Sequence, residues 1–393
     1  MRSEHVRQFA AMRQLRVMWG LSLRQNAMGV INRRKSCSFV GSYLVWSMDM
    51  KRILWIIGAV LALSGCSVQK MAGDAVLDYT KTEAIPYLMA QSDLTSACTM
   101  GQGLGPVVAS LSRIELSPEE VGIGTMMASG MCAEMAQREA ELEKMRALYE
   151  NRTAAAQDAL IREKVGHQLA AARMYTAYEN ALRTYGDLSE GCRSYDSETE
   201  ELLSLLGIAS GALALLHDFN SEKVVGIPLD VPVKIEKAAR CFDDKKWWGM
   251  PTALRASIWL SIPGSGPEGV EPLAAMEEAA RVGDSQGVGL ARAMLAMMAT
   301  NVGAEDVRCR ALAEASPEGM KHEGYALLNA YAYQMMTHQS DMVWTRKQGY
   351  RAPYRLLGCP EASSPAVSDE ALDDILDDMG LDGETEAPSE ASE

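Results

Sequence analysis

Apolar residues recur at every third or fourth position along most of the chain. Two clear stripes run through residues 169–185 and 231–242. This spacing places the apolar side chains on one face of an α-helix, where they can pack against a neighbouring helix. Segments with the alternation typical of strands are almost absent, and the best of them, residues 224–227, falls in a predicted loop. The pattern predicts an all-α protein.

Capping signals mark where several of these helices begin. Residues 117–120 read Ser-Pro-Glu-Glu, with a serine N-cap, a proline at the first helical position and a glutamate three positions after the cap. Residues 197–200 repeat the capping-box spacing, and prolines at 232 and 317 follow further start signals. Helices are predicted near residues 118–150, 154–185, 198–217, 231–242, 249–260, 270–281, 286–300, 304–314 and 318–337.

Two segments carry additional expectations. Residues 67–114 also show helical spacing, although Gly101, Gly103 and Gly105 are expected to interrupt it. The charge-rich stretch 134–152 is predicted to be a long helix that faces solvent.

The predicted helices follow one another in pairs. From about residue 153 these pairs have roughly the size of TPR units, and alanine is abundant at positions where helices would approach closely. A clean TPR consensus is missing. We therefore expect a degenerate TPR-like helical-hairpin repeat array.

A secretory signal precedes this helical body. Lys51 and Arg52 are followed by an apolar run at residues 53–63, and residues 63–66 read Leu-Ser-Gly-Cys. Eleven apolar residues are too few to span a bilayer as a permanent helix, and the cationic and small-residue flanks are those of a signal peptide.

The Leu-Ser-Gly-Cys ending resembles a bacterial lipobox. In precursors of that type the cysteine thiol is lipidated, the signal is cut just before it, and the new amino terminus is acylated, so the resemblance implies lipidation at Cys66. Acyl chains contribute about 0.8 kcal/mol per buried methylene, and several together anchor a protein stably. Ser67 stands where an aspartate is associated with inner-membrane retention. This favours the outer membrane, facing the periplasm of a Gram-negative bacterium. An ordinary signal peptide ending in cysteine is the alternative.

The signal divides the chain into four parts. Signal peptides normally begin within a few residues of their cationic segment, so Met48 or Met50 is the expected translation start. Residues 1–47 are then a mispredicted N-terminal extension, with a cytoplasmic arm in front of an anchor as the alternative. The signal peptide covers residues 48–65, the helical repeat domain 66–360, and an acidic, disordered tail 361–393.

The charge of the chain is unevenly distributed. The 393 residues carry 38 basic and 52 acidic side chains, but the residues up to Cys66 hold ten basic and only two acidic ones. The remaining body is therefore strongly acidic. Such a body repels phosphates, so nucleic acid is not an expected partner.

The tail is more acidic still. Residues 361–393 contain twelve acidic and no basic side chains, a composition that buries too little apolar surface to fold alone. Leu372, Ile375, Leu376 and Met379 would share one face of a short helix. A solvated tail with a transient helix is preferred to a partner-docking motif.

Residues with the spacing of a catalytic or metal site are scarce. Residues 264–269 match G-x-G-x-x-G, but they follow a predicted helix and contain a proline, so they are interpreted as an inter-helix loop. The five histidines show no paired spacing for zinc: they are His5, His167, His217, His322 and His338. We therefore predict no enzyme activity, no metal and no cofactor.

Cysteines suggest an oxidising compartment. Apart from Cys66 and Cys37, six remain, and none forms a C-x-x-C pair. An even number in the periplasm favours disulfides, with fifteen pairings open to six cysteines and free buried thiols as the alternative. Cys192 and Cys241 lie near predicted helix ends, where a bridge is easily formed. The candidates are Cys98, Cys132, Cys192, Cys241, Cys309 and Cys359.

Methionine is unusually frequent, with 25 residues. Most are expected to fill gaps between helices, because the unbranched thioether adapts to irregular spaces. A pocket for a soft, apolar ligand is the sharper alternative, and Trp247 and Trp248 are either core or pocket wall, with core preferred. The clusters of interest are Met126, Met127, Met131 and Met135, and Met294, Met297 and Met298.

A family resemblance rests on the order of several short segments. Residues 65–72, Gly-Cys-Ser-Val-Gln-Lys-Met-Ala, are similar to the mature amino terminus of the TatT lipoproteins, helical TPR-like accessory components associated with some TRAP transporters. The similar segments that follow are residues 171–182 with Arg173 and Tyr175, 205–215 with Ala209 and Gly211, 231–238 and 249–254. The likeness covers roughly residues 66–300. The acidic tail is not a feature of that family.

The resemblance implies a function in binding. A member of that family would be a helical lipoprotein that binds a periplasmic solute-binding receptor around a groove for an apolar ligand. A helical-repeat scaffold in envelope assembly, without a ligand or transport role, is the main alternative. A third is an envelope enzyme whose site the spacing does not reveal. Homo-oligomer formation stays open.

Overall fold

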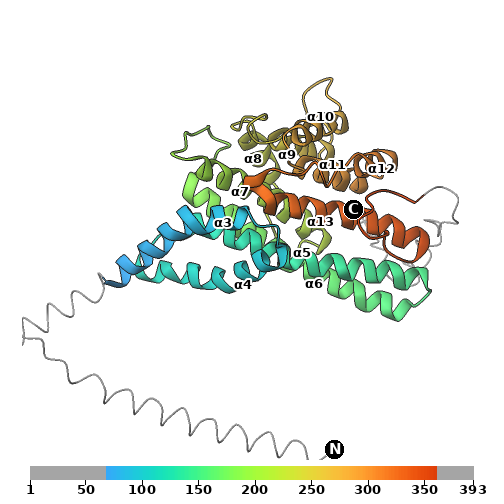
Figure 1. Ribbon diagram of the computed structural model, residues 1–393, viewed down its shortest axis with the longest axis horizontal. Helices are drawn as coiled ribbons and strands as arrows, with labels where there is room; N and C mark the ends of the chain where they lie inside the picture. The colour runs from blue at the N-terminus through green and yellow to red at the C-terminus, as the bar shows by residue number, and fades with distance from the viewer. Residues whose placement is uncertain (1–67, 361–393) are drawn as a thin grey trace, which may run out of the picture. The chain divides into compact units, whose positions relative to one another are not determined.

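The fold described by a computed structural model for residues 68–360 consists of helices and the turns that join them (Figure 1), without a strand in that range. This confirms the all-α prediction. Most predicted helices lie within a few residues of their observed bounds, because the amphipathic stripes and caps mark them locally. The predictions for residues 1–47, for the signal peptide 48–65, for Cys66 and for the tail 361–393 concern residues outside this described range.

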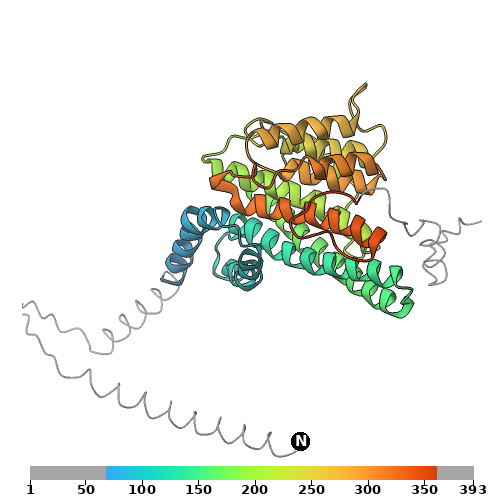
Figure 2. The same cartoon turned by 45° about the vertical axis from the view of Figure 1, so that its right-hand side comes forward.

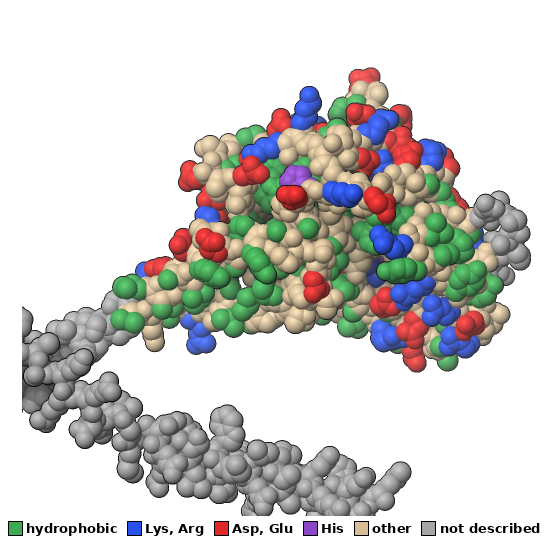
Figure 3. All heavy atoms as spheres, viewed as in Figure 1, with side chains coloured by type: hydrophobic (Ala, Val, Ile, Leu, Met, Phe, Trp, Pro, Cys, Tyr) green, Lys and Arg blue, Asp and Glu red, His purple; other side chains and the backbone are tan. Residues whose placement is uncertain are grey.

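The N-terminal part is an arm of short helices. A helix at residues 68–79 leads through the π-helical turn η1 (Thr80–Ala84) into α3 (Ile85–Met89), which is followed by α4 (Leu94–Ser110) and the 3₁₀ turn η2 (Leu111–Ile114). On the face shown in Figure 3, hydrophobic side chains gather along this arm. Met71, for example, is 70% exposed.

The expected interruption of this segment by glycines was wrong. α4 runs unbroken through Gly101, Gly103 and Gly105. Gly101 faces α5, where a Cβ atom would lie 2.6 Å from the backbone nitrogen of Ser129. The glycine therefore permits close helix packing, which offsets its low helix propensity.

Three long helices form the centre of the protein. They are α5 (Glu119–Tyr149), α6 (Thr153–Tyr185) and α7 (Glu198–Asn220), and each packs along its successor. The prediction that residues 134–152 form a solvent-facing helix was wrong for one face of α5, because Ala140, Leu142, Ala147 and Leu148 are buried. Charged residues alternate with these small and apolar ones, which hid the buried stripe in the sequence.

Five shorter helices pack one after another on the far side of α7. They are α8 (Val231–Ala239), α9 (Met250–Ser261), α10 (Pro272–Ser285), α11 (Leu290–Asn301) and α12 (Glu305–Ala313). After the 3₁₀ turn η3 (Glu323–Tyr325), the last helix, α13 (Ala326–Gln348), returns to contact both α11 and α5. Figures 1 and 2 show α13 between the short helices and the pair formed by α5 and α6. Because α13 closes the array in this way and helix lengths vary widely, the TPR-like repeat stays a prediction.

The start of the last helix was predicted too early. The Ser316-Pro317 signal opens a turn and not a helix: the hydroxyl oxygen of Ser316 accepts a hydrogen bond from the backbone N–H of Gly319, at 3.1 Å. Helix α13 begins only at Ala326. The capping serine therefore stabilises a local turn, and no helix begins directly after it.

One main core connects the central and short helices. Trp247 and Trp248 lie in it, with their rings in an edge-to-face arrangement, so the preferred core interpretation is the one observed. The next residue, Gly249, has a φ of +75°, and a side chain there would collide with the carbonyl oxygen of Ala279. A glycine is thus required where the tandem tryptophans turn into α9.

Three disulfides connect the six candidate cysteines. Cys98–Cys132 joins α4 to α5, Cys192–Cys241 joins the loop before α7 to the turn after α8, and Cys309–Cys359 joins α12 to the segment after α13. Their Cα atoms are 5.1, 5.2 and 5.5 Å apart, within the usual range for a bridge.

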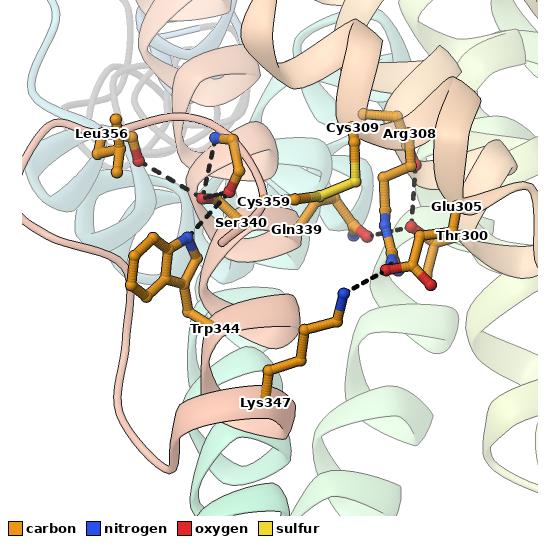
Figure 4. The surroundings of a disulfide bond; sticks show 12 residues. Thr300, Glu305, Arg308, Cys309, Gln339, Ser340, Trp344, Lys347, Leu356 and Cys359 are labelled. Atoms are coloured by element: carbon orange, nitrogen blue, oxygen red, sulfur yellow. Dashed lines mark hydrogen bonds and ion pairs between the residues drawn. A yellow bond between two sulfur atoms is a disulfide. The ribbon is translucent and has the colours of Figure 1, made fainter. Parts of the chain in front are cut away.

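The Cys309–Cys359 disulfide lies beside the last described residue, Pro360 (Figure 4). Beside it, the Ser340 hydroxyl and the indole N–H of Trp344 both donate to the carbonyl oxygen of Gly358, at 2.7 and 3.1 Å. These contacts hold the segment after α13 against that helix.

We predict that this last disulfide contributes measurably to stability. Cys309 and Cys359 are 50 residues apart, and closing a loop of that length in the unfolded chain corresponds to about 4 kcal/mol in the chain-entropy view. The double variant Cys309→Ser/Cys359→Ser should therefore unfold at lower urea, with a free energy of unfolding reduced by about 2–4 kcal/mol. Alkylation of six thiols in unreduced, denatured protein would instead show that the disulfides do not form.

Candidate functional site

An apolar cavity of about 240 Å³ lies among α7, α9, α11 and α13. We call it the apolar chamber. Methionines and leucines form much of its wall, while the small side chains of Ala209 and Ala212 on α7 leave the space open. At its rim, Phe219 is 49% exposed and Leu229 is 72% exposed. The chamber therefore reaches the surface beside exposed apolar side chains.

The two methionine clusters differ in their relation to this chamber. All three members of the second cluster, Met294, Met297 and Met298, line it. In the first cluster, Met127 and Met131 line a separate cavity of about 40 Å³. That space is too small for more than a few waters, so the first cluster fills gaps in the core.

A second cavity of about 180 Å³ adjoins the apolar one and is lined mainly by polar side chains. We call it the polar chamber. Three glutamates, three histidines and an arginine contribute to it from α5, α6, α7 and α13. They are Glu134, Arg138, Glu141, Glu163, His167, His217 and His338.

Glu134 is the centre of a chain of hydrogen bonds. Its side chain is only 1% exposed. The Tyr331 hydroxyl donates to one carboxylate oxygen at 2.5 Å, and His217 Nε2 lies 2.8 Å from the other. The Nδ1 atoms of His217 and His167 are 2.8 Å apart. Four side chains from four helices are thereby connected.

This geometry restricts the protonation of the two histidines. The carboxylate of Glu134 requires a proton on Nε2 of His217. Facing Nδ1 atoms can share only one proton, so the two rings cannot both be charged. Burial, and then the neighbouring His217, lowers the pKa of His167 to about 3.

Each carboxylate in the polar chamber has a hydrogen-bond or ion-pair partner. Burial opposes ionisation of Glu134, yet the nearby Arg138 guanidinium and the hydrogen bonds lower its pKa to about 2. Glu141, also against the effect of burial, has a pKa of about 2 because His338 donates to it at 3.0 Å. Glu163 forms an ion pair with Lys144, with a nitrogen–oxygen distance of 2.6 Å, although burial raises its pKa.

The spacing of residues in the sequence does not reveal this cluster. His167 and His217 are 50 residues apart and meet only because α6 and α7 pack together. A usable signal existed on α5, where Glu134, Arg138 and Glu141 recur at helical spacing on the face that also carries alanines. Charged residues at positions of a buried stripe indicate a polar network inside the core.

The remaining sequence candidates lie elsewhere. Residues 264–269 are in the loop between α9 and α10, as interpreted from the sequence. Within residues 68–360, no group of three or more His, Cys, Asp or Glu side chains is placed to hold a metal ion. Among the described helices, α7 has the length and hydropathy of a membrane span, but 72% of its most apolar window is buried in the protein, as in a core helix.

The network predicts a pH dependence of stability. His167 has a pKa of about 3 when folded and a reference value of 6.5, so the unfolded chain binds the extra proton as pH falls below 6.5. The glutamates add to this loss only below pH 4.5, towards their folded values of about 2. Between pH 6.5 and 5, wild type should therefore lose about 1.5 kcal/mol of unfolding free energy through His167.

Urea titrations at several pH values would measure this loss. In His167→Gln the decline between pH 6.5 and 5 should shrink by that amount, whereas the control His322→Gln, outside the network, should keep it. An unchanged pH profile in His167→Gln would show that His167 is not held neutral.

The segment that precedes the described residues is similar to a known type of sequence. Residues 50–67, which include Cys66, match the family model described as a prokaryotic membrane lipoprotein lipid attachment site. No curated protein and no solved structure matches the chain. The resemblance to the TatT lipoproteins accordingly stays a prediction. The matched segment and the helical fold make this protein a membrane-anchored bacterial lipoprotein with an all-α body.

Proposed function

We propose that this lipoprotein binds an apolar small molecule in the apolar chamber. The single observation that carries this proposal is the chamber itself, an opening of about 240 Å³ lined by apolar side chains. It exceeds the roughly 150 Å³ of an apolar cavity that binds benzene. Exposed apolar side chains at the rim, Phe219 and Leu229, provide an entry for such a ligand.

The lining of the chamber supports a ligand over a simple packing defect. Apolar wall atoms that face an unfilled space lack the dispersion contacts of a packed core. On α7, the small side chains of Ala209 and Ala212 face this space. A bound apolar molecule would restore the lost contacts.

The proposal also includes a protein partner and a particular membrane. The order of motifs resembles that of the TatT lipoproteins, which favours a solute-binding receptor of a TRAP transporter as the protein partner. Ser67 after Cys66 favours the outer membrane, with the body in the periplasm. The protein would then hold or pass on an apolar solute without chemical conversion. The helical scaffold without ligand remains the second candidate, because exposed apolar side chains along the N-terminal arm also suit a protein contact.

Filling the chamber should abolish ligand binding. Met294 lines it, so Met294→Trp adds bulk inside, whereas Val302→Trp adds the same ring at an exposed position just past the end of α11. The mature chain with Cys66→Ala, free of acyl chains, would be titrated with the uncharged fluorophore N-phenyl-1-naphthylamine. We expect saturable binding to wild type and Val302→Trp, and at least tenfold weaker binding to Met294→Trp. No saturable binding to any of them would favour the scaffold.

Anchoring should depend on the thiol of Cys66. Because acylation and signal cleavage occur at that residue in lipoproteins, Cys66→Ala should accumulate as an uncleaved precursor that retains the signal peptide and carries no acyl chains. Ser67→Asp is the matched control: it should remain acylated but shift from outer-membrane to inner-membrane fractions. Fractionation and intact mass measure both. Membrane retention and mass that are the same in Cys66→Ala as in wild type would contradict lipidation.

A further inference from the structure

The two chambers are separated by no more than one layer of side chains. Leu213 and Leu216 on α7, Met297 on α11 and Met335 on α13 line both of them. Methionine side chains are unbranched and rotate easily, so such a wall can open between the chambers without moving a helix. Neither chamber alone reaches the roughly 300 Å³ at the lower end of ligand pockets, but the two together do.

Tyr331 marks the boundary between them. Its side chain lines the apolar chamber, while its hydroxyl donates to Glu134, which lines the polar chamber. A molecule that crosses this boundary would meet hydrocarbon on one side and hydrogen-bonding groups on the other. The site is therefore amphipathic along its length.

The polar chamber carries an excess of negative charge. Three carboxylates, Glu134, Glu141 and Glu163, face two fixed cations, Arg138 and Lys144. The facing Nδ1 atoms of His167 and His217 share one proton, so these two rings cannot both add a positive charge.

His338 contributes a hydrogen-bond donor. Its Nε2 donates to Glu141, while its buried Nδ1 has no hydrogen-bond partner. The carboxylates of the chamber thus outnumber its permanent cations, Arg138 and Lys144, by one.

Neutral polar groups supply the remaining lining. Gln137, Thr300, Asn301 and Gln339 add amide and hydroxyl groups, which hydrogen-bond to hydroxyl and amine groups alike. An anionic head group would instead approach Glu141 and Glu163 in a partly buried site, where like charges repel more strongly than in water.

We propose that the bound ligand is an amphiphile whose hydrocarbon part fills the apolar chamber and whose protonated amine, or failing that an uncharged hydroxyl, lies in the polar chamber. This rests on the proposed function and adds the class of the ligand. It assigns a role to a buried charged network that the packing of the helices does not require. Fatty-acid carboxylates and phosphate esters are rejected by the same charges.

Three ligands with one tail and different heads test this inference. Decylamine, decanol and decanoate would displace N-phenyl-1-naphthylamine from the mature chain with Cys66→Ala, below their micelle-forming concentrations at neutral pH. We expect decylamine to displace the fluorophore at a concentration at least tenfold lower than decanoate, with decanol between them. Equal potency of all three, or a preference for decanoate, would overturn the head-group assignment while leaving an apolar site in place.

Single-glutamate variants test whether the polar chamber causes the head-group preference. Glu141→Gln and Glu163→Gln each remove one negative charge from the polar chamber and should reduce the preference for decylamine over decanoate several-fold. Glu143→Gln, on the same helix but pointing to an exposed ion pair with Arg162, should leave it unchanged. If all these variants keep the wild-type preference for decylamine over decanoate, the head group does not bind in the polar chamber. If the fluorophore does not bind at all, or binds Met294→Trp as well as wild type, the proposed function itself fails.

Discussion

The close approach of α5, α6 and α7 is the constraint on which the rest of the structure depends. It is made possible by glycines at the contact faces: a Cβ atom at Gly130 would lie 2.8 Å from Met174 Cε, and one at Gly166 would lie 2.7 Å from Gln137 Cβ. Gly207 of α7 likewise meets Ala181 of α6. Helices this close exclude large side chains from the contact, so the larger ones are displaced to the edges.

The polar network occupies one such edge. There, charged and polar side chains of α5, α6, α7 and α13 line the polar chamber. Glu134 is ionised there because Arg138, His217 and Tyr331 surround it. Buried ion pairs seldom add net stability over apolar packing, and breaking one is costly. In the proposed function, this network would contact the polar end of the ligand.

The other stabilising features act on the periphery. The three disulfides each tie a loop or a short helix to the body, and the last one fastens the segment after α13 to α12. They leave α7, α9, α11 and α13, which surround the apolar chamber, free of cross-links to one another. The chamber wall can therefore adapt through its methionines while the outer helices stay fixed. The proposed binding of an apolar molecule would depend on this combination.

Much of the fold was accessible from the sequence because it depends on local signals. Helical stripes, the Ser197 cap and the lipobox-like segment ending at Cys66 each involve residues a few positions apart. The site was different. Met294, Met297 and Met298 could be suspected, because they share one helix face, but the chamber that they line also needs α7, α9 and α13. His167, His217 and Glu134 come from three helices, and only tertiary packing brings them within hydrogen-bonding distance. Burial also lowers the pKa of His167, whose ring would be solvated on an isolated helix.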